Sequence, residues 1–268
     1  IPHQVSITKD NAPISIDSST PEALEAALPA YKGKALVNSV TGEDEVLERL
    51  LPLIRKYGAA VIGIANDDTG ISNDPEVRLA VARKIVQRAA DHGIPKEDVI
   101  IDPLCMPIGA NHEFGRITFE TMRLIREGLG VNMSVGAGNV GFGLPDRPPL
   151  TASFVLLGMQ CGLTAAITNA LEPEIYKMIL AGDLMLGRDS FGKKWNAHFR
   201  KASAAKAAAP VTSPGETPAS AARSRSTTKR VRGACSVRSR SVSTTPGVSR
   251  NTSHTRWARA RWPSRSGP

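Results

Sequence analysis

The chain has 268 residues and a net charge of +9, enough for one large α/β domain or two small ones. From Ala202 onward there are 13 Lys and Arg residues and a single acidic residue, Glu216, whereas residues 1–201 carry a net charge of −3. A nucleic-acid-binding surface on the folded part is therefore disfavoured. The three cysteines form no CxxC pair, and the longest apolar run, around 152–167, is too short to span a bilayer. We expect a cytoplasmic protein without a disulfide framework or a zinc site.

Short β-branched runs alternate with helical segments between residues 13 and 200. The runs are 14–16, 35–37, 60–64, 99–101, 131–135 and 165–167. Helical spacing of apolar residues is found in Leu47, Leu50, Leu51 and Ile54, and again in Val77, Val81, Ile85 and Ala89. Helices are expected to begin at Pro21, Pro75 and Pro173, because proline lacks the N–H that a first turn leaves unpaired. Thr41 and Asp44 resemble a capping box with Asp in the Glu position.

This alternation, with nearly continuous apolar strands, predicts a parallel sheet covered by helices. Six strand–helix units suit a doubly wound sheet, whereas a (β/α)8 barrel needs eight, and roughly 60 residues upstream would supply the other two. Ile1 is not an initiator methionine, which fits a chain that begins within a longer protein. The pattern alone leaves both folds open.

The tail, residues 202–268, consists mainly of Ser, Arg, Ala, Thr and Pro and has almost no periodic apolar residues. Such a composition cannot bury a core, so we expect this segment to be disordered. Its Arg-Ser alternation allows an RNA-binding interpretation. The same composition arises when a GC-rich coding sequence is read out of frame, which is the interpretation we favour.

Polar residues follow the expected strands, where parallel α/β folds place their active sites. They are Asp17, Asn38, the run 66–68 (Asn-Asp-Asp), Asp102, Asn139 within the glycine-rich run 136–141, and Asn169. Any single one of them could cap the following helix. Together they offer amide and carboxylate groups to the rim of a flat heterocycle.

Other site chemistries find little support. Lys and Arg are sparse at the strand ends, which disfavours a phosphate site, and there is no Ser-His-acid set, Walker motif or His pair at metal-ligand spacing. The glycines of 136–143 resemble a nucleotide loop only weakly, because no acidic residue follows at the expected distance.

Several motifs resemble one known family in order and spacing. They are 16–19 (IDSS), 37–39 (VNS), 57–63 (YGAAVIG), 101–104 (IDPL), 138–140 (GNV) and 161–163 (CGL). About residues 13–200 are similar to the methyltetrahydrofolate:corrinoid protein methyltransferases and to the folate domain of cobalamin-dependent methionine synthase. The resemblance implies a (β/α)8 TIM-type barrel, usually homodimeric, with a pterin in its mouth. Against that family the first two strand–helix units are absent, including one polar residue of the site, and the tail has no counterpart.

The resemblance also implies a role for individual residues. Asp17, Asn38 and Asp102 would bind the edge of the pterin ring, and Asn139 would hydrogen-bond to its N5. Arg147 falls where the family has an arginine near the folate. Asn139 and Asp102 would be the catalytic pair, and Asp67 is expected to be a turn residue rather than a ligand.

The implied activity is methyl transfer between N5 of 5-methyltetrahydrofolate and the cobalt of a cobalamin-type corrinoid carried by a partner protein. No metal ligand is then needed in this chain. Two alternatives are open: a non-catalytic or inactive pterin-binding fragment, and dihydropteroate synthase. The synthase resemblance would require a lysine after the glycine-rich strand end and an Arg-His pair after the last strand. Residues 141–144 read Gly-Phe-Gly-Leu and 168–170 read Thr-Asn-Ala instead.

Overall fold

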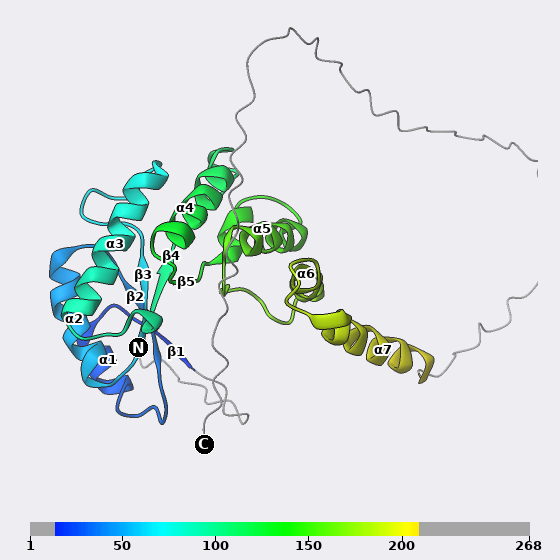
Figure 1. Ribbon diagram of the computed structural model, residues 1–268, viewed down its shortest axis with the longest axis horizontal. Coiled ribbons are helices and arrows are strands. Elements are labelled where there is room, and N and C mark those ends of the chain that lie inside the picture. Colours follow the sequence, from blue (N-terminus) through cyan, green and yellow to red (C-terminus); the bar gives the residue numbers. More distant parts are fainter. Residues whose placement is uncertain (1–13, 209–268) are drawn as a thin grey trace, which may run out of the picture. The chain divides into compact units, whose positions relative to one another are not determined.

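The structure, a computed structural model, describes residues 14–208 and contains one parallel sheet in that range (Figure 1). Its strands are β1 (Ser15–Asp17), β2 (Leu36–Val40), β3 (Ala60–Ile64), β4 (Val99–Asp102) and β5 (Asn132–Met133), in the order β1-β2-β3-β4-β5. The helices are α1 (Pro21–Ala27), α2 (Asp44–Lys56), α3 (Pro75–Asp91), α4 (Phe114–Gly128), α5 (Arg147–Cys161), α6 (Pro173–Met185) and α7 (Lys193–Ala208). Short 3-10 helices are η1 (Lys96–Asp98), η2 (Ala137–Gly141) and η3 (Ser190–Gly192).

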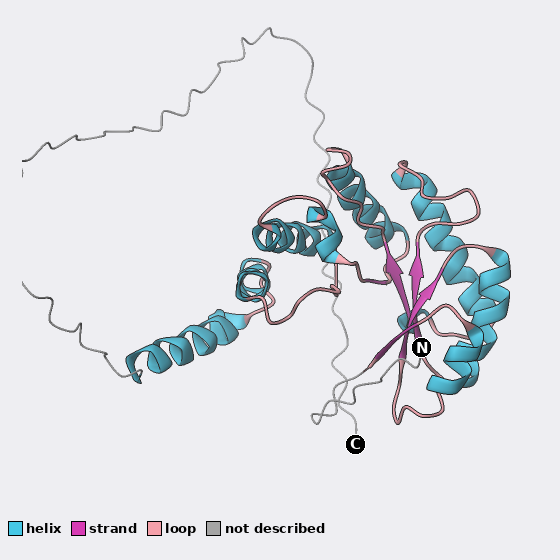
Figure 2. Ribbon diagram, turned by 180° about the vertical axis from the view of Figure 1, so that it is seen from behind, coloured by secondary structure: helices cyan, strands magenta, loops and turns pink. Residues whose placement is uncertain are grey.

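The strand order explains where the first helices lie. Each of the first four connections joins neighbouring parallel strands through a helix, and such crossovers are almost always right-handed. A sheet that always advances in the same direction therefore receives its helices on one face. Figures 1 and 2 show α1, α2 and α3 together on one side of the strands. The five parallel strands alternating with helices confirm the expected α/β class.

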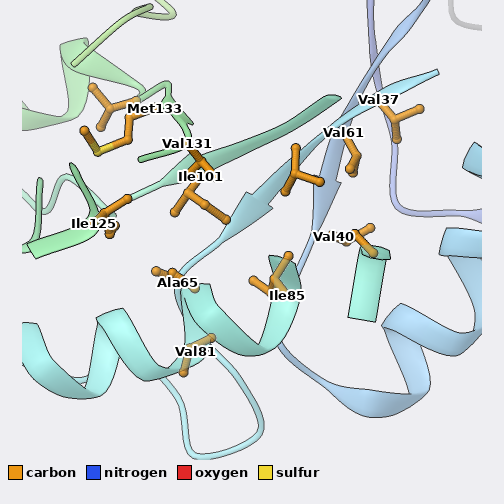
Figure 3. Close-up of a cluster of buried hydrophobic side chains, with 14 of the residues drawn as sticks. Val37, Val40, Val61, Ala65, Val81, Ile85, Ile101, Ile125, Val131 and Met133 are labelled. Carbon is orange, nitrogen blue, oxygen red and sulfur yellow. The ribbon is translucent and has the colours of Figure 1, made fainter. Parts of the chain in front are cut away.

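The core lies between the sheet and this helical layer (Figure 3). Val37, Val61 and Ile101, from β2, β3 and β4, have no exposed surface. Ile85 of α3 packs against the strands at Gly63, where an added Cβ would lie only 2.6 Å from its Cγ2 atom. The glycine in β3 therefore lets α3 approach the sheet more closely than any side chain would allow.

The helical periodicities are largely confirmed. The four leucine and isoleucine positions expected on one face of α2 are all fully buried, as the 3.6-residue repeat requires (Leu47, Leu50, Leu51 and Ile54). On α3, Val81, Ile85 and Ala89 are buried, whereas Val77 in the first turn is 42% exposed and its neighbour Arg78 is buried.

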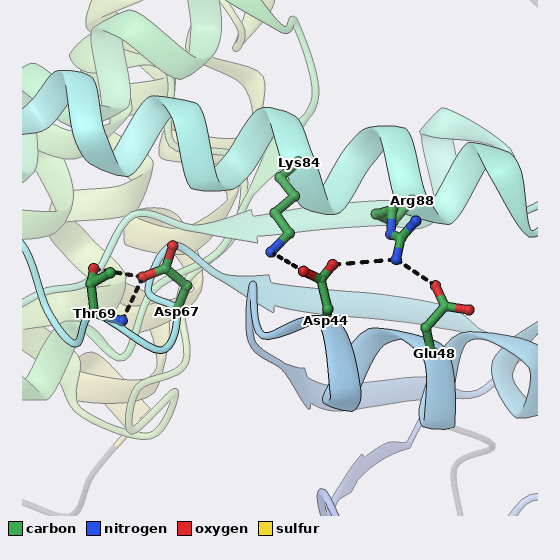
Figure 4. A network of polar contacts seen from close by, with 6 residues as sticks. All are labelled: Asp44, Glu48, Asp67, Thr69, Lys84 and Arg88. Atoms are coloured by element: carbon green, nitrogen blue, oxygen red, sulfur yellow. Dashed lines mark hydrogen bonds and ion pairs between the residues drawn. The ribbon is translucent and has the colours of Figure 1, made fainter.

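Ion pairs join α2 to α3 on the solvent side (Figure 4). Asp44 accepts from Lys84 Nζ at 3.0 Å and from Arg88 Nη2 at 3.2 Å, and Arg88 also lies 2.8 Å from Glu48. The expected capping box at Thr41 is wrong. Thr41 Oγ1 donates to the Glu43 carboxylate instead, and no side chain caps α2.

The three helix starts marked by proline are confirmed, because α1, α3 and α6 begin at Pro21, Pro75 and Pro173. Asp74 adds a side-chain cap to α3 by accepting the Glu76 amide at 2.9 Å.

The sixth expected strand, 165–167, is not a strand, although it runs parallel to the end of β5. Ala165 and Ile167 donate their amides to Met133 O and Val135 O, both at 2.9 Å, and Ile167 forms an isolated parallel bridge with Gly136. The Thr164 hydroxyl takes the place of ladder partners by accepting Met133 N and donating to Met133 O. A side chain inserted at this edge interrupts the regular pairing. Strand β5 itself is shorter than the expected run 131–135, because it pairs with β4 only at Asn132 and Met133.

The expected boundary at residue 202 needs a correction, because α7 continues through Ala208. Residues 202–208 contain five alanines, the best helix formers. The expectations for 209–268 fall outside the described residues, as does Cys235. Cys105 and Cys161 are buried and free. Between residues 14 and 208 no helix is long and apolar enough to cross a membrane.

Candidate functional site

Two expected site residues, Asp17 and Asp102, end strands of this sheet, whereas the third, Asn38, lies inside β2, two residues before its end, because β2 continues past the expected run 35–37. Asp17 ends β1 and pairs in register with Asn38 of β2, and the Ser18 amide donates to the Asn38 carbonyl at 2.8 Å. Asp102 ends β4, where it is in register with Ile64 of β3. Because carboxyl ends of parallel strands meet at one edge, all three side chains belong to the same end of the sheet. Asp17 is exposed, whereas Asn38 and Asp102 are half-buried.

Asp102 has the most strongly perturbed environment of the three. Burial raises its pKa to about 6, against the amides of Leu104 and Gly136 and the positive charge of Arg78, which all favour the carboxylate. The Leu104 amide donates to Asp102 Oδ1 at 2.8 Å. The group is therefore mostly ionised at neutral pH and becomes protonated in mild acid. Such a carboxylate can accept hydrogen bonds from a ligand or hold a proton.

Asn139 is placed by the glycine-rich turn that follows β5. Its amide N–H donates to Gly136 O at 3.0 Å, and its carbonyl accepts the Phe142 amide at 3.0 Å, which closes η2. A Cβ on Gly136 would lie 3.0 Å from Asn139 Nδ2, so the side-chain amide rests directly over the glycine backbone. The Val140 carbonyl accepts the Ile108 amide at 3.0 Å, which joins this turn to the loop after β4. The exposed Asn139 side chain is thus carried on a well-anchored turn.

Arg147, the first residue of α5, faces the same turn. Its Nη2 atom donates to the Gly138 carbonyl, and its guanidinium carbon lies 5.8 Å from the centre of the Phe142 ring. The contact with Gly138 fixes the glycine-rich turn against the helix that follows it. Arg147 therefore stabilises the turn that carries Asn139, and it also forms part of the surface next to that turn.

A pocket of about 460 Å³ lies beside this turn. Its lining comes from the turn, from the first turn of α5, from the segment after the sixth run and from the start of α6 (Gly136, Gly138, Asn139, Arg147, Pro148, Thr151, Ile167, Thr168, Asn169, Glu172 and Ile175). Of the expected site residues, Asn139 and Arg147 line this pocket, whereas Asp17, Asn38 and Asp102 do not. The structure therefore places the expected set in two groups, one at the pocket and one along the strand ends.

Some pocket residues were not expected from the sequence. Thr151 follows Arg147 by four residues and so lies on the same face of α5, a relation visible in the sequence once the helix start is known. Thr168 and Glu172 carried no such signal. Asn169 has a structural use, because its Oδ1 accepts the Leu171 amide at 3.1 Å. Between residues 14 and 200 no cluster of three or more His, Cys, Asp or Glu side chains could hold a metal ion.

Asp67 has the geometry of a turn residue (Figure 4). Its Oδ1 accepts the amide of Thr69 at 3.0 Å and the hydroxyl of the same residue at 2.7 Å, and these bonds lower its pKa. A carboxylate already engaged with its own loop is a poor candidate for a ligand. This agrees with the turn role expected for it.

The described residues thus form a parallel α/β fold with amide and carboxylate groups toward one end of the sheet. Residues 2–169 match the family described as pterin binding enzyme, and the chain belongs to that family. A methylcorrinoid:tetrahydrofolate methyltransferase from Eubacterium limosum is 30% identical over 192 residues, which cover 70% of this chain and 71% of that protein.

Solved structures with the same fold include a dihydropteroate synthetase with a bound product. It superposes with a TM-score of 0.53 at 14% identity and covers 66% of this chain and 69% of its own. The Yersinia pestis DHPS with a pterine-sulfa conjugate gives a TM-score of 0.51 at 15% identity, with coverage of 66% and 70%. At these identities the likeness shows the fold and does not choose among activities.

Proposed function

We propose that this pterin-binding enzyme moves a methyl group between N5 of 5-methyltetrahydrofolate and the cobalt of a corrinoid carried by a partner protein. The observation that carries the proposal is the 30% identity to a methylcorrinoid:tetrahydrofolate methyltransferase over most of both chains. The site is compatible with it, because a half-buried carboxylate and an anchored, exposed amide follow β4 and β5 of one sheet.

In this proposal Asp17, Asn38 and Asp102 bind the pterin edge. Asp17 and Asn38 are register partners on neighbouring strands, so a flat ring can contact both at once. Asp102, ionised at neutral pH, accepts N–H groups of the ring and stabilises positive charge on it. Closure of the sheet into a complete barrel around this edge belongs to the same proposal.

The reaction breaks the bond between N5 and the methyl carbon while a cobalt–carbon bond forms. Co(I) supplies the electron pair of the new bond and becomes Co(III), while the pair of the broken bond stays on N5, which takes up a proton from the solvent. A tertiary amine leaves poorly unless N5 gains positive character, so a group that follows charge on N5 assists the transfer. An asparagine amide can donate one hydrogen bond and accept another, so Asn139 can remain bonded to N5 in both protonation states. The same groups serve the reverse direction.

Calorimetric titration of 5-methyltetrahydrofolate into the full chain tests the proposal. Saturable binding that is weakened in Asp17→Ala and in Asn139→Ala is the expected result. Asp67→Ala is the matched control, because that carboxylate also follows a strand but is engaged with Thr69. A soluble, cooperatively unfolding chain that binds no folate would contradict the proposal.

A corrinoid methylation assay then separates catalysis from binding alone. Methyl transfer to a reduced corrinoid, with a rate that falls in Asn139→Ala, is expected. Folate binding without transfer to or from any reduced corrinoid would instead support the non-catalytic pterin binder.

A further inference from the structure

Arg78 is an arginine in the core with no part in the site described so far. It lies in the first turn of α3, and only 1% of its surface is exposed. Burying a guanidinium is costly unless its N–H groups find acceptors. An apolar residue would fill this position on the buried face of α3 without that cost. The contacts of the guanidinium should therefore explain why a charged residue occupies this position.

Its hydrogen bonds reach across to the loop that follows β4. Nη1 donates to Pro103 O at 2.9 Å and to Leu104 O at 2.8 Å, while Nε donates to Ser72 O at 2.7 Å. Pro103 and Leu104 directly follow Asp102. One side chain from α3 thus binds the carbonyls of both residues that follow Asp102 as the chain leaves the sheet.

Leu104 needs such support, because its φ of +64° lies in the left-handed region that a leucine rarely adopts. Its carbonyl is also bound by the Thr118 hydroxyl of α4 at 3.0 Å. Its amide, in turn, donates to Asp102 Oδ1. The left-handed conformation of Leu104 therefore directs its amide N–H at the Asp102 carboxylate, while Arg78 and Thr118 bind its carbonyl oxygen.

The remaining guanidinium nitrogen, Nη2, is buried and has no hydrogen-bond partner among the described residues. The positive charge of Arg78 and the negative charge of Asp102 each favour the ionised form of the other. The other titratable group facing this pair is the Cys105 thiol, whose pKa burial raises to about 12, so it stays neutral through the physiological range. Arg78 is the positive charge that acts on this carboxylate.

We propose that Arg78 is a positioning residue for the folate site: it fixes the Asp102-Pro103-Leu104 segment and keeps Asp102 as a carboxylate directed at the pterin. The part that concerns the pterin rests on the proposed function. The coupling between Arg78 and Asp102 does not, because it is a property of the chain without any ligand. The two can therefore be tested apart.

The first measurement is an NMR titration of the full wild-type chain without ligand, following the Asp102 side-chain carbon and the Arg78 guanidinium nitrogens. Asp102→Asn assigns the first signal, and Arg78→Lys assigns the second. The expected result is one common midpoint near pH 6, since the pKa of Asp102 is about 6 and Arg78 senses its charge. Arg78 signals that stay constant through the Asp102 titration would overturn the proposal.

Arg78→Gln and Arg78→Lys then separate charge from hydrogen bonding. Arg78→Gln should raise the midpoint of Asp102 by about one pH unit. Arg78→Lys should keep it closer to the wild-type value and yet speed amide hydrogen exchange at Leu104. Arg83→Gln, the same change on the exposed face of α3, is the matched control and should alter neither. An unshifted Asp102 in folded Arg78→Gln, or unchanged exchange at Leu104 in Arg78→Lys, contradicts the assignment.

Folate titration of the same variants as a function of pH completes the test. Wild-type affinity should fall as Asp102 becomes protonated, and Arg78→Gln should move that fall to higher pH by the same amount as the NMR midpoint. If neither the wild type nor any variant binds folate although the NMR coupling is present, the proposed function is wrong and the coupling between Arg78 and Asp102 is still supported. If folate binds but its pH profile is the same in Arg78→Gln, the positioning role is refuted.

Discussion

Replacing Gly136 by alanine is expected to weaken folate binding through the side chain of Asn139. The new Cβ would lie 3.0 Å from Asn139 Nδ2, closer than an ordinary van der Waals contact, so the amide has to move by a few tenths of an ångström. The backbone itself tolerates the change, because the φ of −67° and ψ of 80° at Gly136 are accessible to alanine. The chain should therefore keep its stability while the amide loses the alignment with N5 that the proposed function requires.

The size of the effect follows from one hydrogen bond. A net contribution of about 1 kcal/mol for such a bond corresponds to a loss of roughly five-fold in affinity if most of it is forfeited. Calorimetric titration of 5-methyltetrahydrofolate gives the dissociation constant directly. Thermal unfolding of Gly136→Ala, compared with the wild type, checks that the loss comes from the site and not from the fold.

A double-mutant cycle decides whether Asn139 carries the effect. In an Asn139→Ala background there is no amide to displace, so Gly136→Ala should then change the affinity by less than about two-fold, because the coupling has been removed. An equal loss in both backgrounds would refute the reasoning, since the added methyl would then act on the ligand or on the turn itself. Unchanged affinity in Gly136→Ala alone would show that the Asn139 amide does not need its present position.

Three further changes test the fold and its charges. Gly63→Ala should destabilise the chain by about 1–3 kcal/mol in urea unfolding, because the Cβ would lie 2.6 Å from Ile85 Cγ2; an unchanged midpoint would contradict the close packing of α3. The pKa of Asp102 is raised to about 6 in the folded chain. Between about pH 4 and pH 6 the folded chain therefore keeps a proton that the unfolded chain has already released, so the free energy of unfolding falls as the pH rises through this window. Asp102→Asn should accordingly stabilise the chain by about 2 kcal/mol at pH 8 and have little effect at pH 4, and equal changes in melting temperature at both pH values would count against it. Asp44→Ala removes the exposed ion pairs between α2 and α3 and should cost less than about 1 kcal/mol at low ionic strength, with the difference in urea midpoint disappearing in 1 M salt; a larger, salt-independent loss would assign Asp44 another role.

Local patterns in the sequence predicted most elements correctly, because they depend on neighbouring residues alone. The apolar face of α2 follows from a 3.6-residue repeat, and the starts of α1, α3 and α6 follow from proline. The same reasoning failed where partners distant in the chain compete. The run 165–167 has the composition of a strand, but the Thr164 hydroxyl occupies hydrogen-bonding groups of Met133 that a regular ladder would use.

The sequence by itself determined the α/β class and the positions of Asp17 and Asp102 at strand ends, because parallel strands present their carboxyl ends along one edge whatever the loops do. Only the tertiary structure decided which residues share a pocket with Asn139, since Thr168 and Glu172 reach it from a later segment. Only the tertiary structure also revealed that Arg78 is buried and bound to the loop after β4. A buried arginine in a helix has the sequence appearance of a surface residue, and its contact with Pro103 and Leu104 exists only after α3 has packed against the loop that follows β4.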